Sequence, residues 1–540
     1  MTSQTTVETT DPAEKAPAAS VPPRPKGLRG HPWLTLFSVA IGVMMVALDG
    51  TIVAIANPAI QDDLDASLAD VQWITNGYLL ALAVSLITAG KLGDRFGHRQ
   101  TFLIGVAGFA LASGAIGLSG SVGLVVAFRV LQGLFGALLM PAALGLLRAT
   151  FPAEKLNMAI GIWGMVIGAS TAGGPILGGV LVEHVSWQSV FFINVPVGAL
   201  ALILGLIILK DHRAQNAPRS FDVPGIVLLS GGMFALIWAL IKAGDTWGWG
   251  SGKTLSFLAA AVVLFALFAV WETRVAEPLI PLGMFRSIPL SAGTVLMVLM
   301  AFAFLGGLFF VTFYLQNVHG MSPVESGTRL LPLTGMMIVS SPLAGFLITK
   351  LGPRVPLVGG MVCTAAAMFG MTTLSNTTGT AAMSLWFALL GLGLAPVMVG
   401  ATEVIVGNAP LELSGVAGGL QQAAMQVGGS LGTAVLGAVM SNKVSGDLAG
   451  NWKAAGLPAA PPPGLEQAAT VGIVPKQVAA AKGVTPEFLT KITGVIHDTF
   501  ISGMGLAFTV AGVVAVIAAL VAMLTKRGAN AEAGMGAGHI

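Results

Sequence analysis

The chain has 540 residues, of which 55% are hydrophobic and only 9% are charged. A soluble globular domain carries roughly 25% charged residues, so this composition excludes an ordinary soluble enzyme, a disordered chain and a nucleic-acid binder. We read the net charge of +3 as basic loops of a membrane protein rather than as a site for a polyanion. The only cysteine, Cys363, excludes a disulfide framework and a thiolate metal site, and we expect no metal or other cofactor.

The elements predicted along the chain are almost all membrane helices. Residues 1–32 are polar, lack the apolar core of a cleaved signal peptide and are expected to be a disordered tail. Apolar windows long enough to cross a bilayer then predict an all-α integral membrane protein with fourteen spans. They cover about 33–57, 71–91, 101–119, 122–146, 158–182, 190–210, 223–243, 254–273, 290–314, 327–349, 355–374, 381–407, 416–441 and 500–525.

A weak internal repeat divides these spans into two halves. The segment GKLGDRFGHRQ (90–100) has a degenerate copy in GFLITKLGPRVPLVGG (345–360), which lacks an acidic residue at the place of Asp94. This repeat favours a six-helix bundle over 33–210, two extra helices within 211–275 and a second six-helix bundle over 276–525. Residues 526–540 are expected to be a disordered tail.

The basic residues predict the orientation. An even number of spans puts both termini on one side of the membrane. Connections on that side contain most of the lysines and arginines, whereas the first connection on the other side is acidic. By the positive-inside rule both termini are cytoplasmic, in a multi-pass inner-membrane protein surrounded by lipid. The basic residues on the cytoplasmic side are Lys91, Arg95, Arg99, Arg148, Lys155, Lys210, Arg213, Arg219, Arg274, Arg286, Lys350 and Arg354.

One long connection, 442–499, is predicted to be extracellular. Its first part is rich in alanine and proline (AAGLPAAPPPG), which is typical of a linker. Its last part, PEFLTKITGVIHDTF, has apolar residues at helical spacing. This part is either a helix on the membrane surface or a further piece of linker.

Three charged residues fall inside predicted spans and away from the span ends, where each costs at least about 2.5 kcal/mol. Asp49 and Arg129 lie at a similar depth in the outer half of the membrane, so they could pair directly or through water. Asp49 is the candidate proton-exchanging group, with Arg129 tuning it; the alternative is a static structural pair. Glu403 lies near the cytoplasmic end of its span. It is either a second proton site or a carboxylate whose side chain extends to the membrane–water interface.

Several motifs resemble those of the major facilitator superfamily, and in particular its drug:proton antiporters with fourteen spans. The loop GKLGDRFGHRQ (90–100) is similar to the family's signature loop, and RVLQGLFGALLMPA (129–142) to its fourth-span motif. The segment GIWGMVIGASTAGGPILGG (161–179) resembles the fifth-span motif that distinguishes antiporters from importers. The first-span sequence LDGTIVAIANP (48–58) is also typical of this group.

The resemblance implies roles for residues in two of these motifs. In the family the signature loop latches the two halves together when the cavity opens outward. The matching residues are Gly90, Gly93, Asp94, Arg95, Gly97 and Arg99. The antiporter motif comprises Gly164, Gly168, Gly174, Pro175, Gly178 and Gly179, where small residues allow close packing and proline allows a bend.

Polar and aromatic residues within the spans are candidates for a substrate cavity, although ordinary hydrogen bonding between helices explains most such residues. The candidates are Asn76, Tyr78, Gln132, Tyr314, Gln316, Asn317, Gln421, Gln422 and Gln426.

The predicted function is a proton-coupled antiporter, expected to be a monomer, that exports neutral or monocationic hydrophobic small molecules by alternating access. No nucleotide-binding P-loop is present, so ATP is not expected to drive transport. Two other functions remain open. One is a dedicated exporter of a self-made natural product or a lipid-like molecule, and the other is a receptor or scaffold that transports nothing.

Overall fold

The computed structural model describes residues 28–66, 68–210, 222–243, 247–457, 461–462, 465–474 and 485–526. Fourteen helices in these ranges are long and apolar enough to cross a membrane, and they coincide with the predicted spans. The described residues are almost entirely helical and contain no strand, so the predicted fold class is confirmed. Most of the two expected disordered tails lies outside these ranges.

The first half holds six spans. Short connections place consecutive helices side by side, and the turn between α2 and α3 uses Gly97 at φ 99°, a conformation that favours glycine. The helices of this half are α1 (Pro32–Asp63), α2 (Leu68–Phe96), α3 (His98–Gly117), α4 (Val122–Thr150), α5 (Ala153–His184), and α6 (Ser189–Phe192) with α7 (Asn194–Ile208).

The two inserted helices are α8 (Val223–Lys242) and α9 (Gly252–Glu272). They pair with each other, and α8 also contacts α2 of the first half and α15 (Ser414–Ala454) of the second. Trp238 of α8 packs against Trp73 of α2, with ring centroids 4.9 Å apart. The pair therefore lies beside the boundary between the halves rather than inside either bundle.

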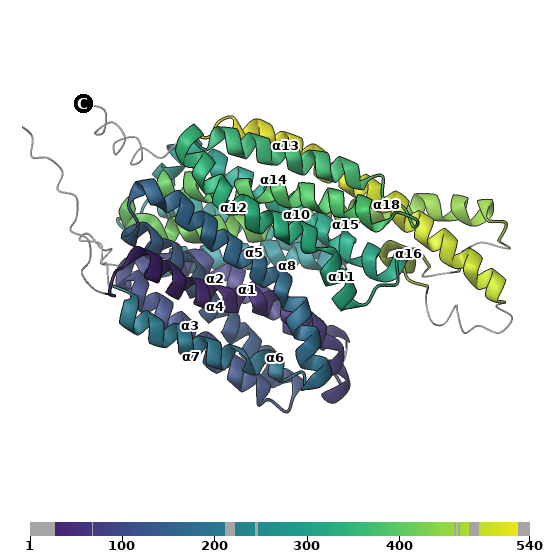
Figure 1. Ribbon diagram of the computed structural model, residues 1–540, viewed down its shortest axis with the longest axis horizontal. Helices are drawn as coiled ribbons and strands as arrows, with labels where there is room; N and C mark the ends of the chain where they lie inside the picture. The colour runs from purple at the N-terminus through teal and green to yellow at the C-terminus, as the bar shows by residue number, and fades with distance from the viewer. Residues whose placement is uncertain are drawn as a thin grey trace, which may run out of the picture.

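The second half repeats the plan of the first. Its turn between α12 and α13 also uses a glycine with positive φ, Gly352 at 80°. In Figure 1 this half, in green to yellow, lies beside the purple and blue first half. Its other helices are α10 (Ile288–Phe313), α11 (Pro323–Arg329), α12 (Leu331–Leu351), α13 (Arg354–Met371), α14 (Thr380–Gly407), α16 (Leu465–Val471) and α18 (Pro486–Ala522).

The long connection is shorter than predicted. Helix α15 continues to Ala454 and α18 already begins at Pro486, so both reach well into the range 442–499 that was assigned to a loop. The segment PEFLTKITGVIHDTF forms the first turns of α18 rather than a separate surface helix. Both extensions have a buried apolar face, which includes Trp452 and Ile496, and this packing explains why they stay helical.

The two halves make a close backbone contact at one end of the molecule, which we call the basic end and define by Arg99, Arg148, Lys350 and Arg354. There α2 packs on α15, and α5 packs on α12. A methyl group on Gly90 would overlap the backbone of Gly415, so only glycines allow this approach of α2 and α15.

Candidate functional site

A buried ion pair lies inside the first half. Arg129 of α4 donates a hydrogen bond from Nη1 to Oδ2 of Asp49 on α1 over 2.5 Å. Asp49 is 0% and Arg129 is 1% exposed. Two charges in such a site are stable only when further hydrogen bonds replace the lost water. The structure thus joins directly the two residues that the sequence placed at a similar depth.

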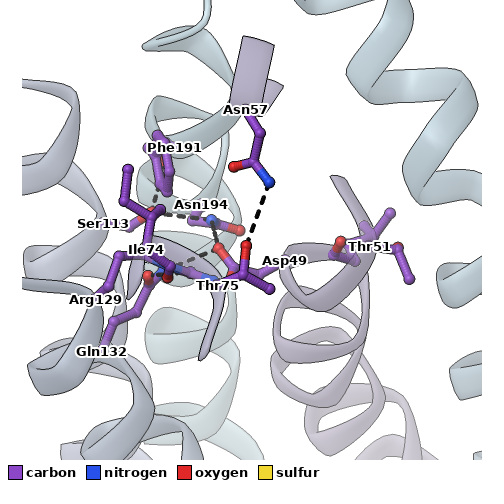
Figure 2. Close-up of polar contacts among 11 residues, drawn as sticks. Asp49, Thr51, Asn57, Ile74, Thr75, Ser113, Arg129, Gln132, Phe191 and Asn194 are labelled. Carbon is purple, nitrogen blue, oxygen red and sulfur yellow. Dashed lines mark hydrogen bonds and ion pairs between the residues drawn. The ribbon is translucent and has the colours of Figure 1, made fainter. Parts of the chain in front are cut away.

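Neutral side chains complete the hydrogen bonding of the carboxylate (Figure 2). Gln132 donates to Oδ1 of Asp49 over 3.0 Å, and Asn194 of α7 donates to the same oxygen over 3.2 Å. Asn194 also donates to Ser113 of α3 over 3.0 Å, and this serine donates to the Phe191 carbonyl. This hydrogen-bond network around the Asp49 carboxylate therefore connects α1, α3, α4 and α7 with the short α6.

The guanidinium of Arg129 is held by three more contacts. Its Nη1 donates to Oε1 of Gln132 over 2.7 Å, and its Nε donates to the Ile74 carbonyl over 3.1 Å. Its central carbon lies 4.0 Å from the ring centroid of Tyr78, a cation–π contact. The arginine therefore has a fixed position against α2, and a change in the charge of Asp49 would act on α2 as well as on α4.

Glu403 lies apart from this network. It is on α14 of the second half, one turn before the end of the helix at Gly407, and it is 5% exposed. The hydrogen-bond partners of Asp49 all belong to the first half. The structure therefore does not bring the two candidate proton sites together.

Asp94 joins the two halves at the basic end. Its Oδ1 accepts a hydrogen bond from the Gly415 amide over 2.7 Å, and its Oδ2 accepts one from the Val416 amide over 2.9 Å. These amides belong to the first turn of α15, where unpaired N–H groups and the helix dipole favour an anion. His98 of the same loop lies 3.3 Å from Oδ1 of Asp94.

The other residues of the signature loop support this contact. Gly97 forms the turn described above, and a methyl group on Gly93 would lie 2.6 Å from Nδ1 of His98. Arg99 donates to the Leu206 carbonyl of α7 over 3.2 Å, and the Arg95 guanidinium lies 5.2 Å from the ring centroid of Phe96. Asp94 thus joins this loop to the start of α15 in the second half.

Arg148 forms a second bridge that the sequence did not single out. From the end of α4 it donates to the Ala409 carbonyl over 2.7 Å and to the Ser414 hydroxyl over 3.2 Å. Its target is the short connection between α14 and α15, whose next residues bind Asp94. An arginine and an aspartate of the first half therefore hold adjacent parts of the same connection.

The antiporter motif packs α5 onto other helices. Near Asp49, a methyl group on Gly174 would overlap the Thr51 hydroxyl, and one on Gly178 would lie 2.9 Å from Cγ1 of Ile52. Nearer the basic end, Gly168 faces Met337 of α12 at an ordinary contact distance of 3.6 Å.

Two further glycines of the motif face the second half. Gly164 lies opposite Val399 of α14, and a methyl group on Gly179 would lie 2.9 Å from Val324 of α11. The side chain of Pro175 is outside the described part of the structure, although its backbone continues α5. The motif therefore lets α5 pack both on α1 beside the ion pair and on the opposite half.

The cavity candidates divide into two groups. Tyr78 and Gln132 belong to the ion-pair network, Tyr314 donates to the Ser375 carbonyl over 2.6 Å, and Asn317 donates to the Val471 carbonyl over 2.6 Å. Gln421 is buried on α15, with its amide nitrogen 3.9 Å from Sδ of Met297. The remaining candidates are half-buried: Asn76, Gln316, Gln422 and Gln426.

Sequence reasoning missed three residues of these networks. Ser113 and Asn194 are uncharged, so their burial carries little of the energetic cost that made Asp49 and Arg129 conspicuous. Arg148 was counted only as a basic loop residue. A weak signal existed for Asn194, because a polar residue lies at the start of an otherwise apolar span, NVPVGALALILGLII.

Two apolar helical bundles in contact, with a buried ion pair in the first, define a multi-pass membrane protein. The particular family is equally clear. This chain belongs to the Major Facilitator Superfamily, whose family model matches residues 39–433.

Its relatives include named exporters. The chain is 68% identical over 505 residues to the tetracenomycin C resistance and export protein of Streptomyces glaucescens, and the match covers 93% of each chain. It is 35% identical over 416 residues to the multidrug resistance protein Stp of Mycobacterium tuberculosis, covering 77% of each chain. Among solved structures, the human organic anion transporter MFSD10 matches with a TM-score of 0.59 at 11% identity, over 91% of this chain and 99% of the other. At that identity the last likeness shows the fold alone.

Proposed function

We propose that this protein exports hydrophobic small molecules, antibiotics among them, from the cell in exchange for protons. The observation that carries the proposal is the Asp49 carboxylate, which is buried, paired with Arg129 and surrounded by neutral hydrogen-bond donors. The likeness to a tetracenomycin C resistance and export protein supports the direction of transport and the kind of substrate.

Protonation of Asp49 is the step that couples the gradient to the motion. A proton removes the charge that Arg129 compensates, and it leaves the guanidinium buried beside a neutral group, which is strongly unfavourable. Helices α1 and α4 then separate or admit water. Because Gly174 and Gly178 pack α5 directly on α1 beside Asp49, the movement reaches α5, which packs on α12 of the second half.

The basic end is the cytoplasmic end in this proposal, in keeping with the positive-inside rule. Asp49 then lies about 25 Å along α1 from its cytoplasmic start, in the outer half of the membrane. A proton from outside reaches this depth more directly than one from the cytoplasm. Asp94 and Arg148 hold the cytoplasmic ends of the two halves together while the proton is exchanged.

Export of one dedicated antibiotic is the second candidate. The name of the 68% identical relative specifies one compound, whereas Stp is named for multidrug resistance. The half-buried Asn76, Gln316, Gln422 and Gln426 are the residues that we propose to contact the substrate, because they are polar and only partly covered by the protein.

Purified protein in liposomes with an imposed pH gradient tests the proposal. Movement of a fluorescent hydrophobic monocation and of tetracenomycin C is followed for the wild type, Asp49→Asn and the control Asp62→Asn, which changes an exposed carboxylate on the same helix. We expect Asp49→Asn to abolish gradient-driven movement and Asp62→Asn to retain it. Retained proton-driven transport by folded Asp49→Asn protein would refute the role of Asp49. Movement of tetracenomycin C alone would favour the dedicated exporter.

A further inference from the structure

A second group of buried carboxyls lies at the base of the inserted helices, far from Asp49 in sequence. Asp222 precedes the first turn of α8 and is 7% exposed, and Glu272 ends α9 and is 4% exposed. Oδ1 of Asp222 accepts hydrogen bonds from the Gly225 amide over 2.9 Å and from Nε1 of Trp271 over 2.7 Å. Asp222 therefore joins the start of α8 to the end of α9.

Glu272 binds the segment that leads into the second half. Its Oε1 accepts a hydrogen bond from the Leu279 amide over 3.2 Å, and its Oε2 accepts one from the Ile280 amide over 3.1 Å. A methyl group on Gly225 would overlap Oδ2 of Asp222 and lie 2.8 Å from Oε1 of Glu272, so the two carboxyls lie side by side. Three of the four carboxyl oxygens thus have N–H donors. The fourth, Oδ2 of Asp222, is buried and has no donor among the residues that the structure describes.

One proton accounts for this arrangement. Two carboxylates in contact, both removed from water, cannot easily be charged together, and such pairs titrate as a unit. A proton on Oδ2 of Asp222 can be donated to Glu272, whereas the other three oxygens already accept hydrogen bonds. We propose that Asp222 and Glu272 form a proton-binding site separate from Asp49, and that Asp222 carries the shared proton on Oδ2.

The charges around the pair are consistent with one proton. Lys91 of α2 is 4% exposed and lies within electrostatic reach of Asp222, Glu272, Glu277 and Asp94. Its Nζ donates to the Pro278 carbonyl over 2.7 Å, so it supports the segment rather than either carboxyl directly. Beyond the end of α9, Arg274 is exposed to solvent. One buried lysine compensates one carboxylate of the pair, and the proton neutralises the other.

This site links the inserted helices to the contact between the halves. Glu272 binds the amides of Leu279 and Ile280, and the Pro278 carbonyl just before them accepts a hydrogen bond from Lys91. Asp94 follows Lys91 by less than one turn of α2. Loss of the shared proton puts two anions in contact at the base of α8 and α9 and loosens the grip of Glu272 on the segment. Proton binding at this site therefore stabilises the contact between the inserted helices and α2.

Infrared titration of the purified protein without substrate tests the proton directly. At neutral pH the wild type should show a protonated-carboxyl band that Asp222→Asn lacks, with a loss equal to one carboxyl per protein. The control Asp62→Asn should keep the band. Coincident spectra of the wild type and Asp222→Asn would overturn the proposal. Because no transport is measured, this outcome is independent of whether the protein exports antibiotics.

Thermal unfolding at several pH values provides the second test. An asparagine at position 222 keeps the Oδ1 acceptor and places an N–H group at the position of the proposed proton. The wild type gains stability by binding a proton that the unfolded chain releases, so this gain is lost as the pH rises through the titration of the site. Asp222→Asn should then melt at increasingly higher temperature than the wild type as the pH rises. A constant difference at all pH values would show a purely structural role and contradict the proposal.

Glu272→Gln should behave differently. The amide has one oxygen for the two N–H groups of Leu279 and Ile280, so one buried donor is left poorly satisfied. This variant should melt below the wild type at every pH. If Asp222→Asn and Glu272→Gln had the same effect, the proton would not be located on Asp222.

Discussion

Oδ2 of Asp94 in α2 accepts a hydrogen bond of 2.9 Å from the amide of Val416 in α15, across 322 positions of sequence. Its Oδ1 binds the preceding amide, so one carboxylate of the first half occupies the start of a helix in the second. The second half offers no counterpart: its copy of the loop has no acidic residue, and Asn157 and Thr349 contribute a weak side-chain contact of 3.4 Å instead. Contact between the halves at the basic end therefore depends more on the loop that contains Asp94 than on its copy at 345–360.

Asp94→Asn should weaken this contact. An amide accepts only on one atom and has no charge for the dipole of α15, and hydrogen bonds to charged groups contribute about 1.5–3 kcal/mol. The ratio of the closed to the open state at the basic end should fall by about tenfold or more. Spin labels at Lys155→Cys and Lys350→Cys, in a Cys363→Ser background, should report longer distances by pulsed electron resonance. An unchanged distribution would contradict the prediction, and Asp62→Asn, at an exposed carboxylate far from the basic end, is the control.

Gly415→Ala should separate the two halves at the same end. The added methyl group would overlap the Gly90 carbonyl, and backbone cannot move aside as a side chain can. The matched control is Gly437→Ala in the same helix, where the added methyl group meets open space and should be neutral or stabilising by up to about 1 kcal/mol. The same pair of labels measures both. Equal distances in the two variants would show that the contact tolerates a side chain.

Asn194→Ala should lower the melting temperature of the purified protein. Asn194 donates to Asp49 and to Ser113, so its removal takes one donor from a buried carboxylate and unties α7 from α3. A hydrogen bond to a charged group contributes about 1.5–3 kcal/mol. Thermal unfolding in detergent measures the loss. A melting temperature equal to that of the wild type would contradict the prediction.

The charge of the substrate should affect transport. Asp49 is already paired with Arg129, so one proton is exchanged at this site, and export of a monocation is then electrically neutral. Export of a dication moves one net charge against the voltage, at a cost of about 2.3 kcal/mol per 100 mV. Liposomes with and without a clamped potential should transport monocations equally, whereas dications should slow under the potential. If the potential did not slow dication transport either, a second proton would have to be exchanged.

The spans and the ion pair could be predicted because both depend on the cost of placing polar groups in lipid. Hydropathy determines where each helix crosses, and charge within a span is rare enough to indicate Asp49 and Arg129 individually. The neutral donors to the pair could not be found in this way. Asn194 and Ser113 are ordinary polar residues until the fold brings α3 and α7 to α1.

Contacts across the two halves were equally hidden. Arg148 and Ser414 are separated by 266 positions, and nothing local in either segment indicates that they meet. The extensions of α15 and α18 were missed for a different reason. The extensions contain polar residues such as Asn451, and the alanine- and proline-rich stretch 454–464 lies between them, so the whole connection resembled a linker. Only mutual burial of apolar faces keeps the extensions helical.

Helix α15 has 41 residues, so it is about 60 Å long, twice the thickness of the hydrocarbon core. One end is fixed by Asp94 and Arg148, and the other ends at Ala454 beside α18. When α15 tilts, the end bound by Asp94 and Arg148 stays nearly in place and the end at Ala454 moves most. A tilt of about 10° displaces the far tip by about 10 Å, given the rise of the helix. A fluorophore on the exposed Lys453 would report motions near the bound end that are too small to see there.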